Sequence, residues 1–350
     1  MVSEQGVEKA DRLAWSSPLR VRFRGLDVRE GLLLRGEAGW GEFSPFWDYD
    51  DAESAMWLRA AREAADLGWP APVRKSIPVN VTIPAVGPEQ ARALVLASGC
   101  TTAKVKIAQQ VLGDEIGNPG SNRQGDQPIS ARITDLATGI AVEPLDVEVA
   151  RVGAVRAALD ELHGPGVGRI RVDANGAWGV GEAVVRLREL DTVAGGLEYA
   201  EQPCATAQEL AELRRALLRA GIDVPIAADE SIRRAADPLR VKALAAADLV
   251  VLKVAPLGGV RACLELAERI ALPVVVSSAL ESSIGLAAGL ALAGALPELP
   301  YACGLATAGL LAHDVIADPL LPIAGHLPVL AANNPRLTPD RASPALTSPA

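Results

Sequence analysis

The chain has 350 residues, of which 49% are hydrophobic and 22% are charged, and its net charge is −9 at pH 7. This composition is typical of a soluble globular protein with room for one large α/β domain and a smaller one. The acidic balance and the lack of a long basic run exclude nucleic acid as an expected partner. The polar N-terminus does not resemble a signal peptide, and the apolar run 284–296 is too short to span a bilayer. We therefore expect a cytoplasmic protein that does not insert into a membrane.

The first part of the chain lacks a regular alternation of strands and helices. Antiparallel strands are expected at 21–23, 28–34 and 39–43. A helix is expected over 52–67, with Asp50 or Asp51 as its N-cap. Residues 1–75 are therefore predicted to form an N-terminal α+β domain.

From Pro78 the pattern changes to a regular alternation of strands and helices, which indicates a parallel sheet. The expected strands are 79–83, 103–107, 169–173, 196–201, 224–228, 249–253, 273–277 and 302–304. Helices are expected between them, for example over 206–220 and 258–270. Eight strands in this rhythm predict a TIM-type barrel, and the lack of a Gly-x-Gly-x-x-Gly motif disfavours a dinucleotide-binding fold.

Residues 109–144 interrupt this rhythm with a polar stretch rich in Gly, Asn, Gln and Asp. Such a long stretch in a compact domain is either functional or mobile, and the composition favours a mobile surface insertion over an active-site lid. Residues 133–142 are expected to form a small hairpin within it. The tail from Ala331, which is rich in proline, is expected to be loosely ordered.

Three carboxylates follow three successive expected strands at equal intervals. Asp173, Glu201 and Asp229 each stand 28 residues from the next. Acids that end successive strands of a parallel barrel converge at its C-terminal mouth. Because three such acids repel one another, the pattern predicts a site for a hard cation such as Mg²⁺ or Mn²⁺, which prefers oxygen ligands.

Lysines stand before and after this series. Lys104 and Lys106 lie two apart on one expected strand and so share a face, and Lys253 ends the apolar run 249–252. Buried lysines would be costly in a purely structural core, which favours a functional role at the mouth. A lysine becomes a general base at neutral pH when a neighbouring lysine and a divalent cation lower its pKa.

Other side chains are candidates for supporting roles. Asn175 could hold a ligand or simply form the turn before Gly176, and Glu230 is expected to pair with Lys104 or Lys106. None of the three histidines follows a strand next to an acid, so a histidine base is not expected. The four cysteines are far apart and are typical of buried residues in a reducing compartment.

At these residues the chain resembles the enolase superfamily, in its muconate-lactonizing-enzyme-like subgroup. Lys-Val-Lys at 104–106 is similar to the family's Lys-x-Lys motif, whose second lysine is catalytic. The resemblance implies a modified (β/α)₇β barrel over 76–309 and a capping domain over 1–75 that residues 310–345 complete. It implies Lys106 and Lys253 as catalytic lysines and the three strand-end acids as ligands of Mg²⁺. Loops at 16–24 and 43–50 are then expected over the mouth, with Phe43 and Trp47 as substrate contacts.

Within the subgroup, several segments look like the actinobacterial o-succinylbenzoate synthases of menaquinone biosynthesis. These segments are RVDANGAW, EQPC, AADESIR, LKVAPLGG and VVVSSAL. The implied reaction is a syn-dehydration of 2-succinyl-6-hydroxy-2,4-cyclohexadiene-1-carboxylate, in which Lys106 removes the α-proton and Lys253 stabilises the intermediate. Ser277, Ser278, Ser282 and Gly304 are candidates to bind the succinyl carboxylate, although Ser278 and Ser282 could equally cap helices.

Two alternatives stay open at this point. One is another lysine-dependent reaction of the subgroup, above all racemisation of N-succinylamino acids. The second is a metal-holding barrel without catalysis, which the presence of both Lys106 and Lys253 disfavours. The partner is expected to be a small carboxylate, and the sequence is compatible with a monomer without deciding the oligomeric state.

Overall fold

The computed structural model describes residues 12–108, 110–112 and 140–346. Its N-terminal part is an antiparallel sheet in the order β1–β2–β3, followed by helix α1 (Asp51–Arg62). Strand β1 begins at Arg12, well before the predicted start, and pairs with β2 along most of its length. Of the two predicted N-cap residues, Asp50 is the one that caps α1, and it forms a capping box with Glu53. The helix continues as one π-helical turn, Glu63–Leu67.

The remaining strands form a parallel sheet in the order β13–β12–β11–β10–β9–β6–β5. Isolated bridges close it, because Cys303 pairs with Val79 and Gly304 pairs with Ser277. The eighth predicted strand is thus reduced to two bridged residues. A Cβ at Gly304 would lie 2.4 Å from Ser277 Oγ, so a glycine permits this close approach. The barrel is closed, and its strands end at one common mouth.

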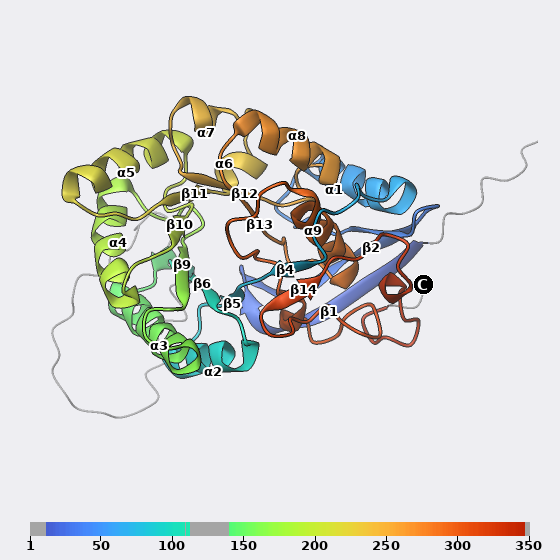
Figure 1. Cartoon of the computed structure of the whole chain (residues 1–350), viewed down its shortest axis with the longest axis horizontal. Helices are drawn as coiled ribbons and strands as arrows, with labels where there is room; N and C mark the ends of the chain where they lie inside the picture. Colours follow the sequence, from blue (N-terminus) through green and yellow to red (C-terminus); the bar gives the residue numbers. More distant parts are fainter. Residues whose placement is uncertain (1–11, 109, 113–139, 347–350) are drawn as a thin grey trace, which may run out of the picture.

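Helices surround the barrel, and the antiparallel sheet lies to one side of it (Figure 1). The strands are β1 (Arg12–Phe23), β2 (Leu26–Arg35), β3 (Trp40–Phe43), β4 (Ser76–Pro78), β5 (Val81–Ile83), β6 (Thr102–Lys106), β7 (Gln110–Leu112), β8 (Ile140–Val142), β9 (Arg169–Asp173), β10 (Tyr199–Glu201), β11 (Ile226–Ala228), β12 (Leu249–Leu252), β13 (Val274–Val276) and β14 (His326–Pro328). The further helices are α2 (Pro88–Ser98), α3 (Leu145–His163), α4 (Val180–Ala194), α5 (Ala207–Ala220), α6 (Glu230–Arg233), α7 (Arg240–Ala243), α8 (Val260–Ile270), α9 (Ser283–Ala295) and the 3₁₀ turns η3 (Ala308–Leu310) and η4 (Pro335–Leu337).

The barrel strands are short apolar runs because they are covered on both faces. All residues of β10, β11, β12 and β13 are buried. Helix α9 is also buried almost all round, which agrees with its apolar sequence. Within the part of the chain that the structure describes, no helix combines the length and apolar character needed to cross a membrane.

The C-terminal segment returns to the N-terminal sheet. Leu311 bridges Leu19, and Leu346 bridges Trp15. Ala345 is fully buried, and Ser343 donates a hydrogen bond to the carbonyl of Asp314. The expectation of a loosely ordered tail is therefore wrong for residues 331–346, because Leu337 packs in the barrel core and Ala345 packs against Trp15 and Leu33 of the N-terminal sheet. The exact domain boundaries at 75 and 309 stay a prediction.

The polar insertion is described only at its two ends. There β7 pairs antiparallel with β8. Most of the predicted hairpin at 133–142 lies outside the described residues. The two ends of the insertion, 110–112 and 140–142, are therefore held together. Residues 113–139 and their predicted mobility lie outside the described residues.

A buried polar cluster fastens the N-terminal sheet to the barrel. Glu42 on β3 accepts hydrogen bonds from the backbone N–H groups of Ser282 and Gly285, at the start of α9. Arg29 on β2 donates to the carbonyl of Leu280 at 3.2 Å. Because α9 presents its unpaired N–H groups there, the Glu42 carboxylate satisfies the helix end. The N-terminal domain is thereby held beside the 277–282 loop.

Candidate active site

The three predicted acids lie side by side at the carboxyl ends of adjacent strands. Asp173 ends β9, Glu201 ends β10, and Asp229 follows β11 directly. The parallel register places Glu201 opposite Asp173. All three side chains are buried. The sequence therefore located their common position correctly.

Three lysines meet these acids. Lys106 ends β6 opposite Asp173, and its Nζ lies 2.5 Å from Asp173 Oδ2. Lys104 Nζ lies 3.1 Å from both carboxylate oxygens of Glu201 and 3.4 Å from Asp173 Oδ2. Lys253, next after β12, donates to Asp229 Oδ2 at 2.6 Å. Each acid is thus in contact with a lysine from another strand.

Burial and the neighbouring charges together shift the pKa values of these groups, and the direction differs from group to group. Burial and then the charge of Asp173 raise the pKa of Glu201 to about 7. Burial opposes ionisation of Asp173, but the Lys106 and Lys104 charges outweigh it and lower its pKa. Burial would lower the pKa of Lys104, but the charges of Glu201 and Asp173 raise it instead. Lys104 is therefore held cationic, whereas Glu201 is a carboxylate in need of more positive charge.

Burial dominates at Lys253 and lowers its pKa, against the opposing charge of Asp229. For Asp229, burial works against ionisation, but Arg233 and then Lys253 lower its pKa overall. Asp229 is therefore anionic between two cations from different parts of the fold.

The donor set fits a hard divalent cation, since it consists of three adjacent buried carboxylates, one of them short of compensating charge. The expectation that they already surround one point is not met. Among the described residues, no group of three His, Cys, Asp or Glu side chains is arranged to hold a metal ion. The reason is that the carboxylates turn toward Lys104, Lys106 and Lys253. Ion binding therefore requires them to exchange lysine contacts for metal contacts.

The residues around the acids form a small cavity between the barrel and the N-terminal domain. Its volume is about 30 Å³, and its lining includes the predicted residues Lys104, Lys106, Asn175, Lys253, Ser277, Ser278 and Gly304. The N-terminal domain contributes Phe23, Arg24 and Phe46. This space admits a water molecule but not a substituted ring, so substrate entry requires the lining to open.

The predicted contacts between the N-terminal domain and the barrel mouth are correct for the segments involved but not for the side chains. The loops 16–24 and 43–50 do reach the mouth, but through Phe23, Arg24 and Phe46. Trp47 is 83% exposed and donates to Glu30, and Phe43 packs in the adjoining apolar cluster. The prediction of Phe43 and Trp47 as cavity residues is therefore wrong, because the loop turns Phe46 inward at its centre.

The supporting residues behave differently from one another. Asn175 has a left-handed backbone (φ 48°) and accepts from Lys106 Nζ at 2.8 Å. Glu230 accepts from Asn175 and from Arg233, so the predicted pairing with Lys104 or Lys106 is wrong. Helix α6 starts at Glu230 and places Arg233 one turn further on, closer than either lysine.

The serines also divide into two kinds. Ser277 and Ser278 line the cavity, with Ser278 Oγ 2.8 Å from Thr307 Oγ1. Ser282 is the N-cap of α9 and donates to Glu42, so its role is structural. The Oγ of Thr82 lines the same cavity and has no hydrogen-bond partner among the described residues.

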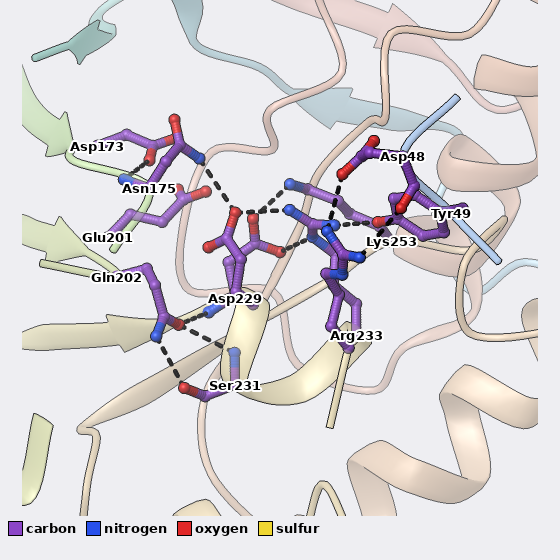
Figure 2. A network of polar contacts seen from close by, with 12 residues as sticks. Asp48, Tyr49, Asp173, Asn175, Glu201, Gln202, Asp229, Ser231, Arg233 and Lys253 are labelled. Atoms are coloured by element: carbon purple, nitrogen blue, oxygen red, sulfur yellow. Dashed lines mark hydrogen bonds and ion pairs between the residues drawn. The ribbon is translucent and has the colours of Figure 1, made fainter. Parts of the chain in front are cut away.

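A second layer of polar residues, which the sequence reading did not single out, holds the acids in place (Figure 2). Gln202 Oε1 accepts from the backbone N–H groups of Asp229 and Ser231. Arg233 donates to Asp229 Oδ1 at 3.0 Å. The sequence did contain an indication of both residues. Gln202 directly follows the predicted ligand Glu201, and Arg233 lies one helical turn after the predicted ligand Asp229.

A closed barrel with strand-end acids, facing lysines and a cavity under an added domain defines a class of metal-dependent barrel enzymes. Comparison with known proteins agrees with this class.

Residues 88–335 match the family described as "Enolase C-terminal domain-like", and residues 14–65 match "Enolase N-terminal domain-like". The o-succinylbenzoate synthase of Thermobifida fusca (strain YX) is 58% identical over 316 residues, which cover 90% of this chain and 86% of that protein. The enzyme of the same name from Mycobacterium tuberculosis (strain H37Rv) is 49% identical over 93% of this chain and 84% of its own length.

Solved structures show the same fold at lower identity. A muconate lactonizing enzyme from Pseudomonas fluorescens gives a TM-score of 0.70 at 22% identity, covering 95% of this chain and 96% of its own. An L-Ala-D/L-Glu epimerase from Bacillus subtilis gives 0.68 at 19% identity, covering 97% and 99%. The chain belongs to the enolase superfamily and, within it, to the family of the o-succinylbenzoate synthases. Enzymes of this superfamily use a divalent metal ion.

Proposed function

We propose that this enzyme is an o-succinylbenzoate synthase, which dehydrates 2-succinyl-6-hydroxy-2,4-cyclohexadiene-1-carboxylate to o-succinylbenzoate and water in menaquinone biosynthesis. The observation that carries the proposal is the arrangement of Lys106 and Lys253. They contact one set of carboxylates, Lys106 from the end of β6 and Lys253 from just after β12, and both line the cavity. The high identity to curated synthases supports the same substrate.

Lys106 is proposed as the base and then the acid of the reaction. Its Nζ takes the proton from the carbon next to the ring carboxylate. The same Nζ then returns a proton to the leaving hydroxyl, so that the C–O bond breaks and water departs from the same face. Asn175 supports this role, because its Oδ1 lies 2.8 Å from Nζ and orients the amine. The aromatic product makes the second step strongly downhill.

Lys253 and Lys104 are proposed to act by charge. Lys253 lines the cavity together with Lys106 and stabilises the negative charge that develops when the proton leaves. Lys104 contacts Glu201 and Asp173 and offsets the repulsion between them. Because its pKa is raised, Lys104 keeps its proton and is unsuited to be the base.

Asp173, Glu201 and Asp229 are proposed to hold the divalent ion, as Mg²⁺ or Mn²⁺. When bound, the ion supplies Lewis-acid stabilisation of the substrate carboxylate. Asn175 and Glu230 lie next to these three acids. The backbone N–H of Asn175 donates to Asp173, and its side-chain amide donates to Glu230. The succinyl carboxylate is proposed to bind at Ser277, Ser278 and the backbone of Gly304, which line the cavity wall.

The partner is therefore a small dicarboxylate. A cytoplasmic location is proposed from the four cysteines, which are all free and buried. The lysines, the acids and the cavity all come from one chain, so the proposed site is compatible with a monomer.

The test is an ultraviolet assay for o-succinylbenzoate with purified protein, the cyclohexadiene substrate and Mg²⁺. We expect formation of product that EDTA abolishes and added Mg²⁺ restores. Racemisation of an N-succinylamino acid without o-succinylbenzoate formation would contradict the proposal and favour the racemase alternative.

A further inference from the structure

Arg233 connects the acid site to the N-terminal domain. It ends α6, four residues after Asp229, and this spacing returns its side chain to the start of the helix. Its Nε donates to Asp229 Oδ1 at 3.0 Å, and one terminal nitrogen donates to Glu230 Oε1 at 2.5 Å. Its other terminal nitrogen donates to the hydroxyl of Tyr49. The Arg233 side chain is only 1% exposed, and its contacts with Asp229 and Tyr49 are buried.

Asp229 is consequently held from both sides. Lys253 binds Oδ2, and Arg233 binds Oδ1. The guanidinium is planar and has a fixed arrangement of donors, so a partner at one end constrains the orientation at the other. The position of Tyr49 therefore bears on the direction in which Asp229 points.

Tyr49 belongs to a buried aromatic cluster of the N-terminal domain. Its ring centre lies 5.9 Å from that of Phe46 and 5.7 Å from that of Trp57. Phe46 also lines the cavity, so one aromatic cluster contacts the substrate space and the partner of Arg233. Figure 2 shows Tyr49 on one side of the Arg233 guanidinium and Asp229 on the other.

The next residue strengthens the same junction on the surface. Arg234 pairs with Asp48 and Glu53, each at 2.8 Å, and its guanidinium lies 4.7 Å from the centre of the Tyr49 ring. Arg234 does not contact the three acids. It is therefore a natural control, because it joins the same two domains without touching Asp229.

We propose that Arg233 is a positioning residue that orients Asp229 for the divalent ion and couples this orientation to the docking of the N-terminal domain through Tyr49. Opening of the nearly closed cavity then disturbs the Tyr49–Arg233 contact and weakens ion binding. Return of the domain over the substrate restores both. This inference rests on the proposed role of Asp229 as a ligand.

The experiment measures Mn²⁺ affinity by electron paramagnetic resonance, without substrate, in four forms of the full chain. These are the wild type, Tyr49→Phe, Arg233→Lys and Arg234→Lys. Tyr49→Phe removes one hydroxyl, and the loss of one hydrogen bond should weaken Mn²⁺ binding about three- to tenfold. Arg233→Lys keeps the positive charge but loses the planar set of guanidinium donors, and should weaken Mn²⁺ binding about ten- to a hundredfold. Arg234→Lys should leave it within about twofold of the wild type.

Circular dichroism and thermal unfolding establish that each variant is folded. If Arg233→Lys does not fold, the comparison of Tyr49→Phe with Arg234→Lys still decides the question. Wild-type affinity in Tyr49→Phe, or an equal loss in Arg234→Lys, would overturn the coupling. The proposed function fails separately, if the wild type binds Mn²⁺ but forms no o-succinylbenzoate.

Discussion

Lys106 Nζ lies 2.5 Å from Asp173 Oδ2 because β6 and β9 pair in a parallel register that sets these two residues opposite each other. The proposed base and the first proposed ligand are therefore the last residues of neighbouring strands.

The first prediction separates the two proposed catalytic lysines. Lys106→Ala removes the only group proposed to carry the proton, so activity should fall to the limit of detection. Lys253→Ala keeps the proton acceptor and loses charge stabilisation, so kcat should fall by about 10²–10³-fold. The measurement is exchange of the α-proton with solvent deuterium on a non-eliminating substrate analogue. Exchange at the wild-type rate in Lys106→Ala, but not in Lys253→Ala, would mean that the roles are reversed.

The second prediction concerns Lys104 as a structural cation. Lys104→Met leaves Glu201 and Asp173 buried without their shared partner, which should reduce the free energy of unfolding by about 3–5 kcal/mol. The loss should shrink at saturating Mg²⁺, since the ion supplies the missing charge. Urea unfolding with and without Mg²⁺ measures both effects. Lys242→Met, at an exposed lysine, is the control and should change little. An equal loss with and without Mg²⁺ would argue against a shared site.

The third prediction uses two neighbours in the 43–50 loop. Phe46 is 6% exposed and lines the cavity, whereas Trp47 is 83% exposed. Phe46→Leu should raise KM for the substrate several-fold, because the cavity wall loses its ring, and Mn²⁺ affinity should change less. Trp47→Ala should leave both near the wild-type values. Steady-state kinetics and Mn²⁺ titration are the measurements, and a larger effect from Trp47→Ala would refute this picture of the cavity.

The fourth prediction concerns pH. Burial and then the charge of Glu42 raise the pKa of Glu281 from 4.5 to about 7. The folded chain thus binds this proton more tightly than the unfolded chain. Its contribution to stability is fully present below pH 4.5 and is lost as the pH rises through about 7.

Glu281→Gln stays neutral and removes this dependence. The difference in unfolding free energy between Glu281→Gln and the wild type should therefore shift in favour of the variant between pH 5 and pH 8, by up to roughly 3 kcal/mol. Urea titrations at the two pH values measure it, with the exposed Glu298→Gln as the control. The same difference at both pH values would show that Glu281 does not titrate in this range.

The sequence alone determined the parallel barrel, the position of its acids and the lysines that meet them. It could do so because strand ends in a barrel share one mouth, so equal spacing along the chain becomes proximity in space. The cap of α1 at Asp50 and the helix over 207–220 followed from local hydrogen bonding and periodicity in the same way. These features depend on near neighbours in the chain and on one general property of the fold.

Only the tertiary structure decided which side chains meet across domains. Phe46 of the N-terminal domain faces the cavity, whereas its neighbour Trp47 is exposed. Tyr49 and Arg233 stand 184 residues apart and belong to different units, so no local pattern connects them. Such contacts depend on how two preformed surfaces dock, and docking is set by the shape and charge of both surfaces together.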